Sequence, residues 1–139
     1  QPPVRFYERL EPAVFVLRLV PGMRADIIPL LAPHYRALVL ESFGVGGLPG
    51  GEHGEMFAAL RRWCESGRLA VFTTQVPHEG CDLAVYEVGR AVGELPGVLE
   101  ARDMTPEAVA VKLMWALGQT EDREKAARLF ETPIEYDIM

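Results

Sequence analysis

The residues best suited to ligand chemistry lie in two short segments. The first, residues 42–51, is rich in glycine and contains Ser42, Gly44, Gly46 and Gly47. Glycines allow backbone amides to approach a ligand closely. The segment is not a dinucleotide fingerprint, because Pro49 stands where a third glycine is needed, and no Gly-Lys-Ser/Thr of a phosphate loop follows it. On glycine content alone, an ordinary flexible turn is the simpler interpretation.

The second segment begins with Thr74 and Gln75, whose hydroxyl and amide groups suit a small polar ligand. Both segments follow apolar runs, residues 36–42 and 69–74, that predict strands of a parallel sheet. Open parallel sheets bind ligands beyond the carboxyl ends of their strands. We therefore predict a ligand site at this edge, made by Ser42, Gly44, Gly46, Gly47, Thr74 and Gln75. The alternative is that the threonines are simply good strand residues and Gln75 caps a backbone group.

Residues 78–82 bring His78 and Asp82 together with a glutamate and a cysteine, all of which can bind metals. A closed zinc site needs four ligands, and no second pair has suitable spacing, so we predict a solvated polar loop and no metal. Ser42 with His78 and either Asp82 or Asp103 would form a hydrolase triad on paper. The nucleophile elbow G-x-S-x-G is absent, so no catalytic residue is assigned.

Strand and helix patterns alternate along the chain. Strands are predicted at residues 14–20, 36–42, 69–74 and 98–101, and the first three helices at 25–31, 56–64 and 85–92. A fourth helix starts after a Thr105 cap and ends at Gly118, and a fifth follows residues 120–122. This order predicts a three-layer α/β domain of about four parallel strands with helices on both faces.

Composition narrows the possible partners and compartment. The 139 residues are 49% apolar and carry a net charge of −6, which argues against nucleic acid and anionic lipid as partners. No segment has the length of a membrane span or the pattern of a signal peptide. Two cysteines, Cys64 and Cys81, without framework spacing indicate a reducing compartment, so a cytoplasmic protein is expected. We predict one domain over 1–139, with residues 1–12 a linker-like start that follows something longer.

Three arginines, Arg61, Arg62 and Arg68, lie on or just after the second predicted helix. They would make a small basic patch. On an amphipathic helix such a group is usually the solvated face, and this is the interpretation adopted for all three.

Four stretches, in order, resemble the C-terminal domain of type I L-asparaginases. They are L-V-P-G-M at 19–23, V-L-E-S-F-G-V-G-G-L-P at 39–49, T-Q-V at 74–76 with Y-x-V-G at 86–89, and D-M-T-P-E-A at 103–108 with K-L-M at 112–114. Each is modest alone, but four in order are specific. A subunit of archaeal glutamyl-tRNA amidotransferase carries a similar domain.

The resemblance implies a flavodoxin-like domain with a four-stranded parallel sheet. It also implies the parent reaction, in which L-asparagine and water give L-aspartate and ammonia without a metal or organic cofactor. In that family a threonine nucleophile, a second threonine and an Asp–Lys pair lie in the N-terminal domain, in motifs such as T-G-G-T-I. This sequence has no such motif, so the chain alone is expected to be inactive.

The family's C-terminal domain packs on the N-terminal domain, builds the oligomer and lends residues to a neighbouring active site. Gly47 stands where many members have asparagine, and Glu41 stands where some carry a regulatory arginine. A carboxylate reverses the charge offered to an α-carboxylate. Two alternatives to an enzyme domain stay open: a sensing module for amino acids, and a purely structural oligomerisation domain.

Overall fold

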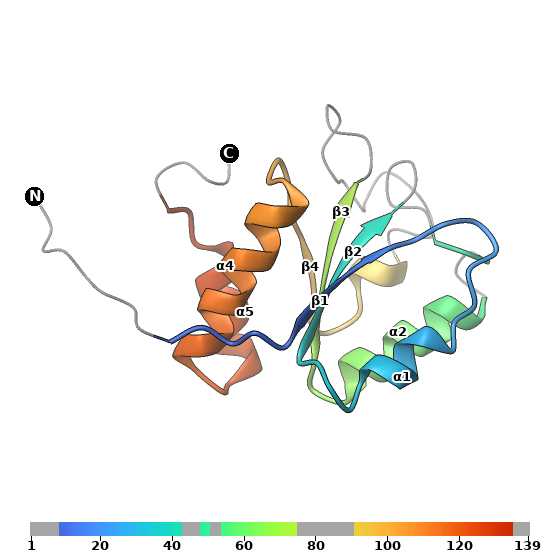
Figure 1. Ribbon diagram of the computed structural model, residues 1–139, viewed down its shortest axis with the longest axis horizontal. Coiled ribbons are helices and arrows are strands. Elements are labelled where there is room, and N and C mark those ends of the chain that lie inside the picture. Colours follow the sequence, from blue (N-terminus) through green and yellow to red (C-terminus); the bar gives the residue numbers. More distant parts are fainter. Residues whose placement is uncertain (1–8, 43–47, 51–53, 75–90, 135–139) are drawn as a thin grey trace, which may run out of the picture.

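A four-stranded parallel sheet forms the centre of the molecule (Figure 1). The computed structural model describes residues 9–42, 48–50, 54–74 and 91–134. The strands are β1 (Val14–Arg18), β2 (Ala37–Ser42), β3 (Leu69–Thr74) and β4 (Val98–Glu100), in spatial order β1-β2-β3-β4. The predicted parallel α/β sheet is confirmed, and the start and end of β3 agree with the prediction to the residue.

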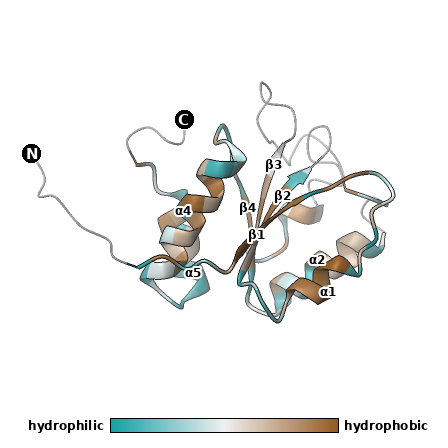
Figure 2. Cartoon of the chain, viewed as in Figure 1, coloured by the Kyte–Doolittle hydropathy of each residue, from teal (hydrophilic) through white to brown (hydrophobic). Residues whose placement is uncertain are grey.

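Helices cover both faces of this sheet. Helices α1 (Ile27–Leu31) and α2 (Glu55–Glu65) lie on one face, and α4 (Pro106–Gln119) and α5 (Arg123–Glu131) lie on the other (Figure 1). The hydropathy colouring shows apolar strands between these layers (Figure 2). No helix in the described parts of the chain is long and apolar enough to cross a membrane. The predicted three-layer arrangement is confirmed.

Two separate cores result from the period-two alternation of β2 and β3. Leu40 and Phe72 pack with α1 and α2 in one core, and Val39 and Val71 pack with α4 and α5 in the other. All four side chains are fully buried. Strands buried on both faces read as continuous apolar runs, which is why the sequence located them well.

The crossovers between successive strands run on one face. Helices α1 and α2 connect β1 to β2 and β2 to β3, and Val92, in a helical turn before β4, belongs to the same core as they do. Helices α4 and α5, which follow the last strand, pack on the opposite face. The strands therefore lie in chain order, with no reversal of the order among those described.

Local differences from the predicted boundaries have simple causes. Strand β1 ends at Arg18 although Leu19 and Val20 are apolar, because the chain turns at Gly22, whose φ is +81°. Leu19 still donates its N–H to the carbonyl of Glu41 at 2.9 Å. The predicted helix at 85–92 falls mostly outside the described residues. In the described part of this region, residues 91–93 are helical.

Helix α4 starts as its sequence predicts. Thr105 Oγ1 accepts the Ala108 N–H at 3.2 Å, and Pro106 occupies the first helical position. Replacing Thr105 by alanine is expected to lower the free energy of unfolding by about 1 kcal/mol, because an amide of the first turn loses its acceptor. Urea denaturation measures this loss, and Thr105→Ser is the control that keeps the acceptor. Equal stability of the alanine and serine variants would contradict the capping role.

Candidate functional site

The carboxyl ends of β2 and β3 lie side by side, as the sequence predicted. Ser42 is the register partner of Thr74, and Glu41 is the partner of Thr73. The two predicted ligand loops therefore start from neighbouring positions on one edge of the sheet. Gly44, Gly46, Gly47 and Gln75 lie outside the described residues, so the ligand role of the whole set stays a prediction.

Ser42 joins these two strand ends. Its side chain is fully buried and its Oγ donates to the carbonyl oxygen of Thr73 at 3.1 Å. A hydroxyl that donates to the main chain has no proton to give to a catalytic base in the same conformation. The hypothetical triad therefore gains no support from Ser42. Of its other members, His78 and Asp82 lie outside the described residues, and Asp103 lies in the turn before α4.

Glu41 places a carboxylate near the same edge. Its side chain is 15% exposed, and its Oε2 lies 3.7 Å from Nε of Arg18, its register partner on β1. Arg18 is 63% exposed, so the pair contributes little stability in water. A carboxylate here attracts an ammonium group rather than a carboxylate. No short-range sequence pattern links Arg18 to Glu41, because only the strand register brings the two residues together.

The far end of the glycine-rich segment is a built turn that leads into α2. Leu48 is buried in the core beneath that helix. Gly50 has a φ of +81°, and a Cβ added at Gly54 would lie 2.8 Å from the carbonyl carbon and oxygen of Gly50. Glycine is required at both positions for reasons of backbone geometry. For residues 48–50 and 54, the ordinary turn interpretation therefore holds.

The strand order does not by itself build a crevice at the carboxyl edge. In open parallel sheets a crevice forms where neighbouring crossovers run to opposite faces. Here the crossovers through α1 and α2 run on the same face. A ligand bound beyond β2 and β3 would need a further wall, from the loops at this edge or from another protein domain.

The predicted basic patch divides into two parts. Arg61 and Arg62 are exposed on α2, and Arg61 Nε lies 3.7 Å from Glu65 Oε1, so the solvated interpretation is right for them. Arg68 does not fit it, because the chain leaves the helix at Gly67, with a φ of +91°. Arg68 is half-buried and donates to the carbonyl of Tyr35 at 3.0 Å and that of Ala32 at 2.7 Å.

Cys64 is the one described thiol, and it is buried. Desolvation raises its pKa to about 11, against a smaller lowering by the Arg123 charge. Only about one such thiol in a thousand is ionised at pH 8, so Cys64 has little nucleophilic character. In a Cys81→Ser variant, we expect Cys64 to react with a thiol reagent only after unfolding in urea. Rapid labelling of the native protein at pH 8 would contradict this burial.

Within the described ranges no three His, Cys, Asp or Glu residues group as metal ligands.

The described residues form a parallel α/β domain in which β2 and β3 end side by side. The glutaminase/asparaginase C-terminal domain family matches residues 13–130, and the chain belongs to this family. The sequence is 38% identical over 133 residues to an L-asparaginase of Thermococcus kodakarensis and 35% identical over 130 residues to a glutamyl-tRNA(Gln) amidotransferase subunit of Metallosphaera sedula. The resemblance seen in the sequence is thereby confirmed.

Solved structures give the same relationship. The thermostable L-asparaginase from Thermococcus kodakarensis superposes with a TM-score of 0.85 over 94% of this chain and 39% of that one. L-asparaginase I from Vibrio cholerae, 28% identical, gives a TM-score of 0.80 over 93% of this chain and 38% of that one. The chain spans 40% of the Thermococcus asparaginase sequence and 28% of the Metallosphaera amidotransferase sequence.

Proposed function

We propose that this chain is the C-terminal domain of an L-asparaginase, which converts L-asparagine and water into L-aspartate and ammonia. Its work is to pack on an N-terminal catalytic domain, to form oligomer contacts and to supply part of the substrate site. The observation that carries the proposal is the superposition of 94% of this chain on 39% of an L-asparaginase at a TM-score of 0.85. A match of this extent supports assigning the chain to one part of a longer enzyme.

The geometry of the carboxyl edge supports a role in completing a site. The ends of β2 and β3 lie side by side, but the strand order builds no crevice there. A second domain set against this edge would provide the missing wall and exclude water from a small polar substrate. Glu41 then offers a carboxylate to the α-ammonium group of an amino acid.

The chain alone is proposed to be inactive. The T-G-G-T-I motif of the family nucleophile does not occur in the sequence. Ser42 and Cys64 are poorly suited to act as nucleophiles. The Ser42 hydroxyl donates a hydrogen bond to a carbonyl, and the Cys64 thiol is protonated at neutral pH. The reaction needs an activated nucleophile, which this proposal assigns to the N-terminal domain.

A hybrid enzyme tests the proposal. The C-terminal 133-residue region of the Thermococcus asparaginase is replaced by the matching region of this chain. We expect the hybrid to release ammonia from asparagine, and this chain alone to release none above a buffer blank. The control is the Thermococcus enzyme with that region deleted, which we expect to be inactive. Ammonia release by the chain alone would contradict its inactivity, and a folded but inactive hybrid would contradict its role in site completion.

An amino-acid sensing module is the second candidate, and the carboxylate of Glu41 at the carboxyl edge favours it. This candidate predicts saturable heat on titrating the chain with asparagine or aspartate, and loss of that heat in Glu41→Gln. Arg18→Gln is the matched control, because it removes the partner charge and keeps the carboxylate. Absence of heat across a panel of amino acids would remove this candidate.

The proposal includes a cytoplasmic location and a homo-oligomeric parent enzyme that needs no cofactor. A buried, unpaired Cys64 suits a reducing compartment. Cell fractionation tests the location, and sedimentation velocity of the hybrid enzyme tests the assembly. A strictly monomeric active hybrid would contradict the oligomeric part of the proposal.

A further inference from the structure

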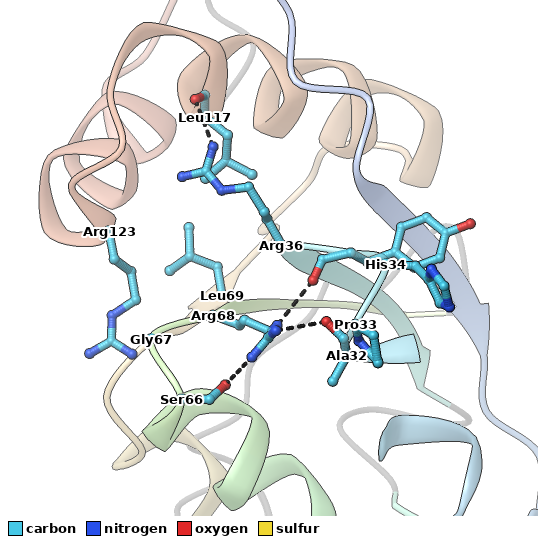
Figure 3. A pocket seen from close by; sticks show the side chains of 11 residues that line it. Ala32, Pro33, His34, Arg36, Ser66, Gly67, Arg68, Leu69, Leu117 and Arg123 are labelled. Carbon is cyan, nitrogen blue, oxygen red and sulfur yellow. Dashed lines mark hydrogen bonds between the residues drawn. The ribbon is translucent and has the colours of Figure 1, made fainter. Parts of the chain in front are cut away.

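A pocket lies at the amino edge of the sheet, opposite the candidate site. It has a volume of about 260 Å³ and lies between the segments that lead into β2 and β3 (Figure 3). Three arginines line it: Arg36, just before β2; Arg68, just before β3; and Arg123, at the start of α5. Three cations from distant parts of the sequence therefore meet in one pocket of a chain whose net charge is −6.

Each of the three guanidinium groups donates to a carbonyl at the C-terminal end of a different helix. Arg68 Nη2 bonds the carbonyl of Ala32 after α1 at 2.7 Å, Arg123 Nη1 bonds that of Cys64 in α2 at 2.5 Å, and Arg36 Nη1 bonds that of Leu117 in α4 at 3.2 Å. These bonds oppose the negative helix ends, and at Cys64 the bond adds to the Gly67 N–H that the same carbonyl accepts at 3.0 Å. They also fix the position of each guanidinium group before any ligand arrives.

Arg68 is held most firmly. Its Nε donates to the carbonyl of Tyr35 at 3.0 Å, its Nη1 donates to Ser66 Oγ at 2.6 Å, and its guanidinium carbon lies 5.3 Å from the centre of the Trp63 ring. A guanidinium group has about five N–H donors, and these bonds together with that to Ala32 use three. Within the described chain Arg123 uses one of its five, at Cys64. Donors therefore remain on both groups.

Charge pairing separates Arg36 from the other two arginines. Arg36 Nη1 lies 3.6 Å from Glu11 Oε2, so a carboxylate already offsets its charge. Among the described residues, neither Arg68 nor Arg123 has a carboxylate within ion-pair distance. The helix ends offset part of their charge but leave donors that suit an oxyanion.

We propose that this pocket binds a small oxyanion-bearing ligand, inorganic phosphate or a small dicarboxylate, between Arg68 and Arg123. Guanidinium groups match the paired oxygens of phosphates and of carboxylates in geometry and charge. The volume lies below the usual range for drug-sized ligands, about 300–1,000 Å³, so the ligand is small. Binding here does not depend on the proposed function, because the pocket lies at the opposite edge of the sheet.

Titration of the 139-residue chain with phosphate and with succinate tests the proposal. Binding is followed by amide chemical shifts at constant ionic strength, with sodium chloride as the blank. We expect saturable shifts centred on residues 66–68 and 123, and at least about tenfold weaker binding in Arg123→Gln, which loses a charge-assisted contact. The matched control Arg24→Gln removes an exposed arginine, paired with Asp26, outside the pocket and leaves binding unchanged.

Each outcome decides the proposal. Saturation by phosphate alone or by succinate alone supports it and identifies which oxyanion the pocket prefers. Arg123→Lys is the second variant, which keeps the charge if Arg123→Gln unfolds, and it should bind more weakly than the unmodified chain. The proposal would be overturned if the shifts did not saturate at ligand concentrations well above about 1 mM. It would also be overturned if Arg24→Gln weakened binding as much as Arg123→Gln. The three arginines would then serve only to cap helices.

Discussion

Replacing Leu60 by alanine is expected to lower the free energy of unfolding by about 2–5 kcal/mol. Leu60 lies on α2 with a fully buried side chain, in the core that also contains Leu40 and Phe72. The substitution removes apolar burial and leaves a cavity, because the sheet and the surrounding side chains relax only partly. Urea denaturation followed by far-ultraviolet circular dichroism measures the loss.

Leu30→Ala is the matched control for this prediction. Leu30 lies on α1, in the same helical layer, but its side chain is 66% exposed. Its replacement should change stability by no more than about 0.5 kcal/mol. Similar losses in the two variants would mean that α2 does not pack on the sheet as described.

Gly118→Ala is expected to destabilise the domain by about 1–3 kcal/mol through overpacking. A Cβ at Gly118, near the end of α4, would lie 2.5 Å from the carbonyl oxygen of Arg9 and 3.0 Å from the Cα of Leu10. Residues 9 and 10 must then move, which breaks the 2.9 Å hydrogen bond that Gln119 Nε2 donates to the Arg9 carbonyl. Alanine gains about 1 kcal/mol in helix propensity, which the backbone clash outweighs.

Gly93→Ala serves as the control for the glycine prediction. Gly93 lies in the helical turn at 91–93, and a Cβ there meets no atom within 4 Å. Its replacement should leave stability unchanged or raise it by up to about 1 kcal/mol. Thermal unfolding of both variants provides the comparison. A Gly118→Ala protein as stable as Gly93→Ala would show that residues 9 and 10 do not pack against α4.

The strands were predictable because strands buried on both faces appear in the sequence as continuous apolar runs. The predicted strand at 69–74 has the same bounds as β3, and that at 36–42 missed β2 by one residue. The end of β1 was less predictable, since Val20 is apolar yet 44% exposed. Hydropathy alone does not show where a strand loses its neighbour and the chain turns.

The candidate site was predictable only in its location. Parallel strands must end at one edge, so the proximity of Ser42 and Thr74 followed from the sequence pattern. The Arg18–Glu41 pair depends on strand register, and the bonds of Arg68 to the loop before β2 span more than 30 residues. Contacts of this kind have no short-range signal, and so the arginine pocket was missed.

We propose that this chain is the accessory C-terminal part of an asparagine-hydrolysing enzyme. The measurement that tests it most directly is ammonia release from L-asparagine by the full gene product that contains this chain, with the 139-residue chain assayed in parallel. We expect activity in the full product and none in the chain. A full product that folds but releases no ammonia would contradict it, and would leave a domain that keeps the family fold without the family reaction.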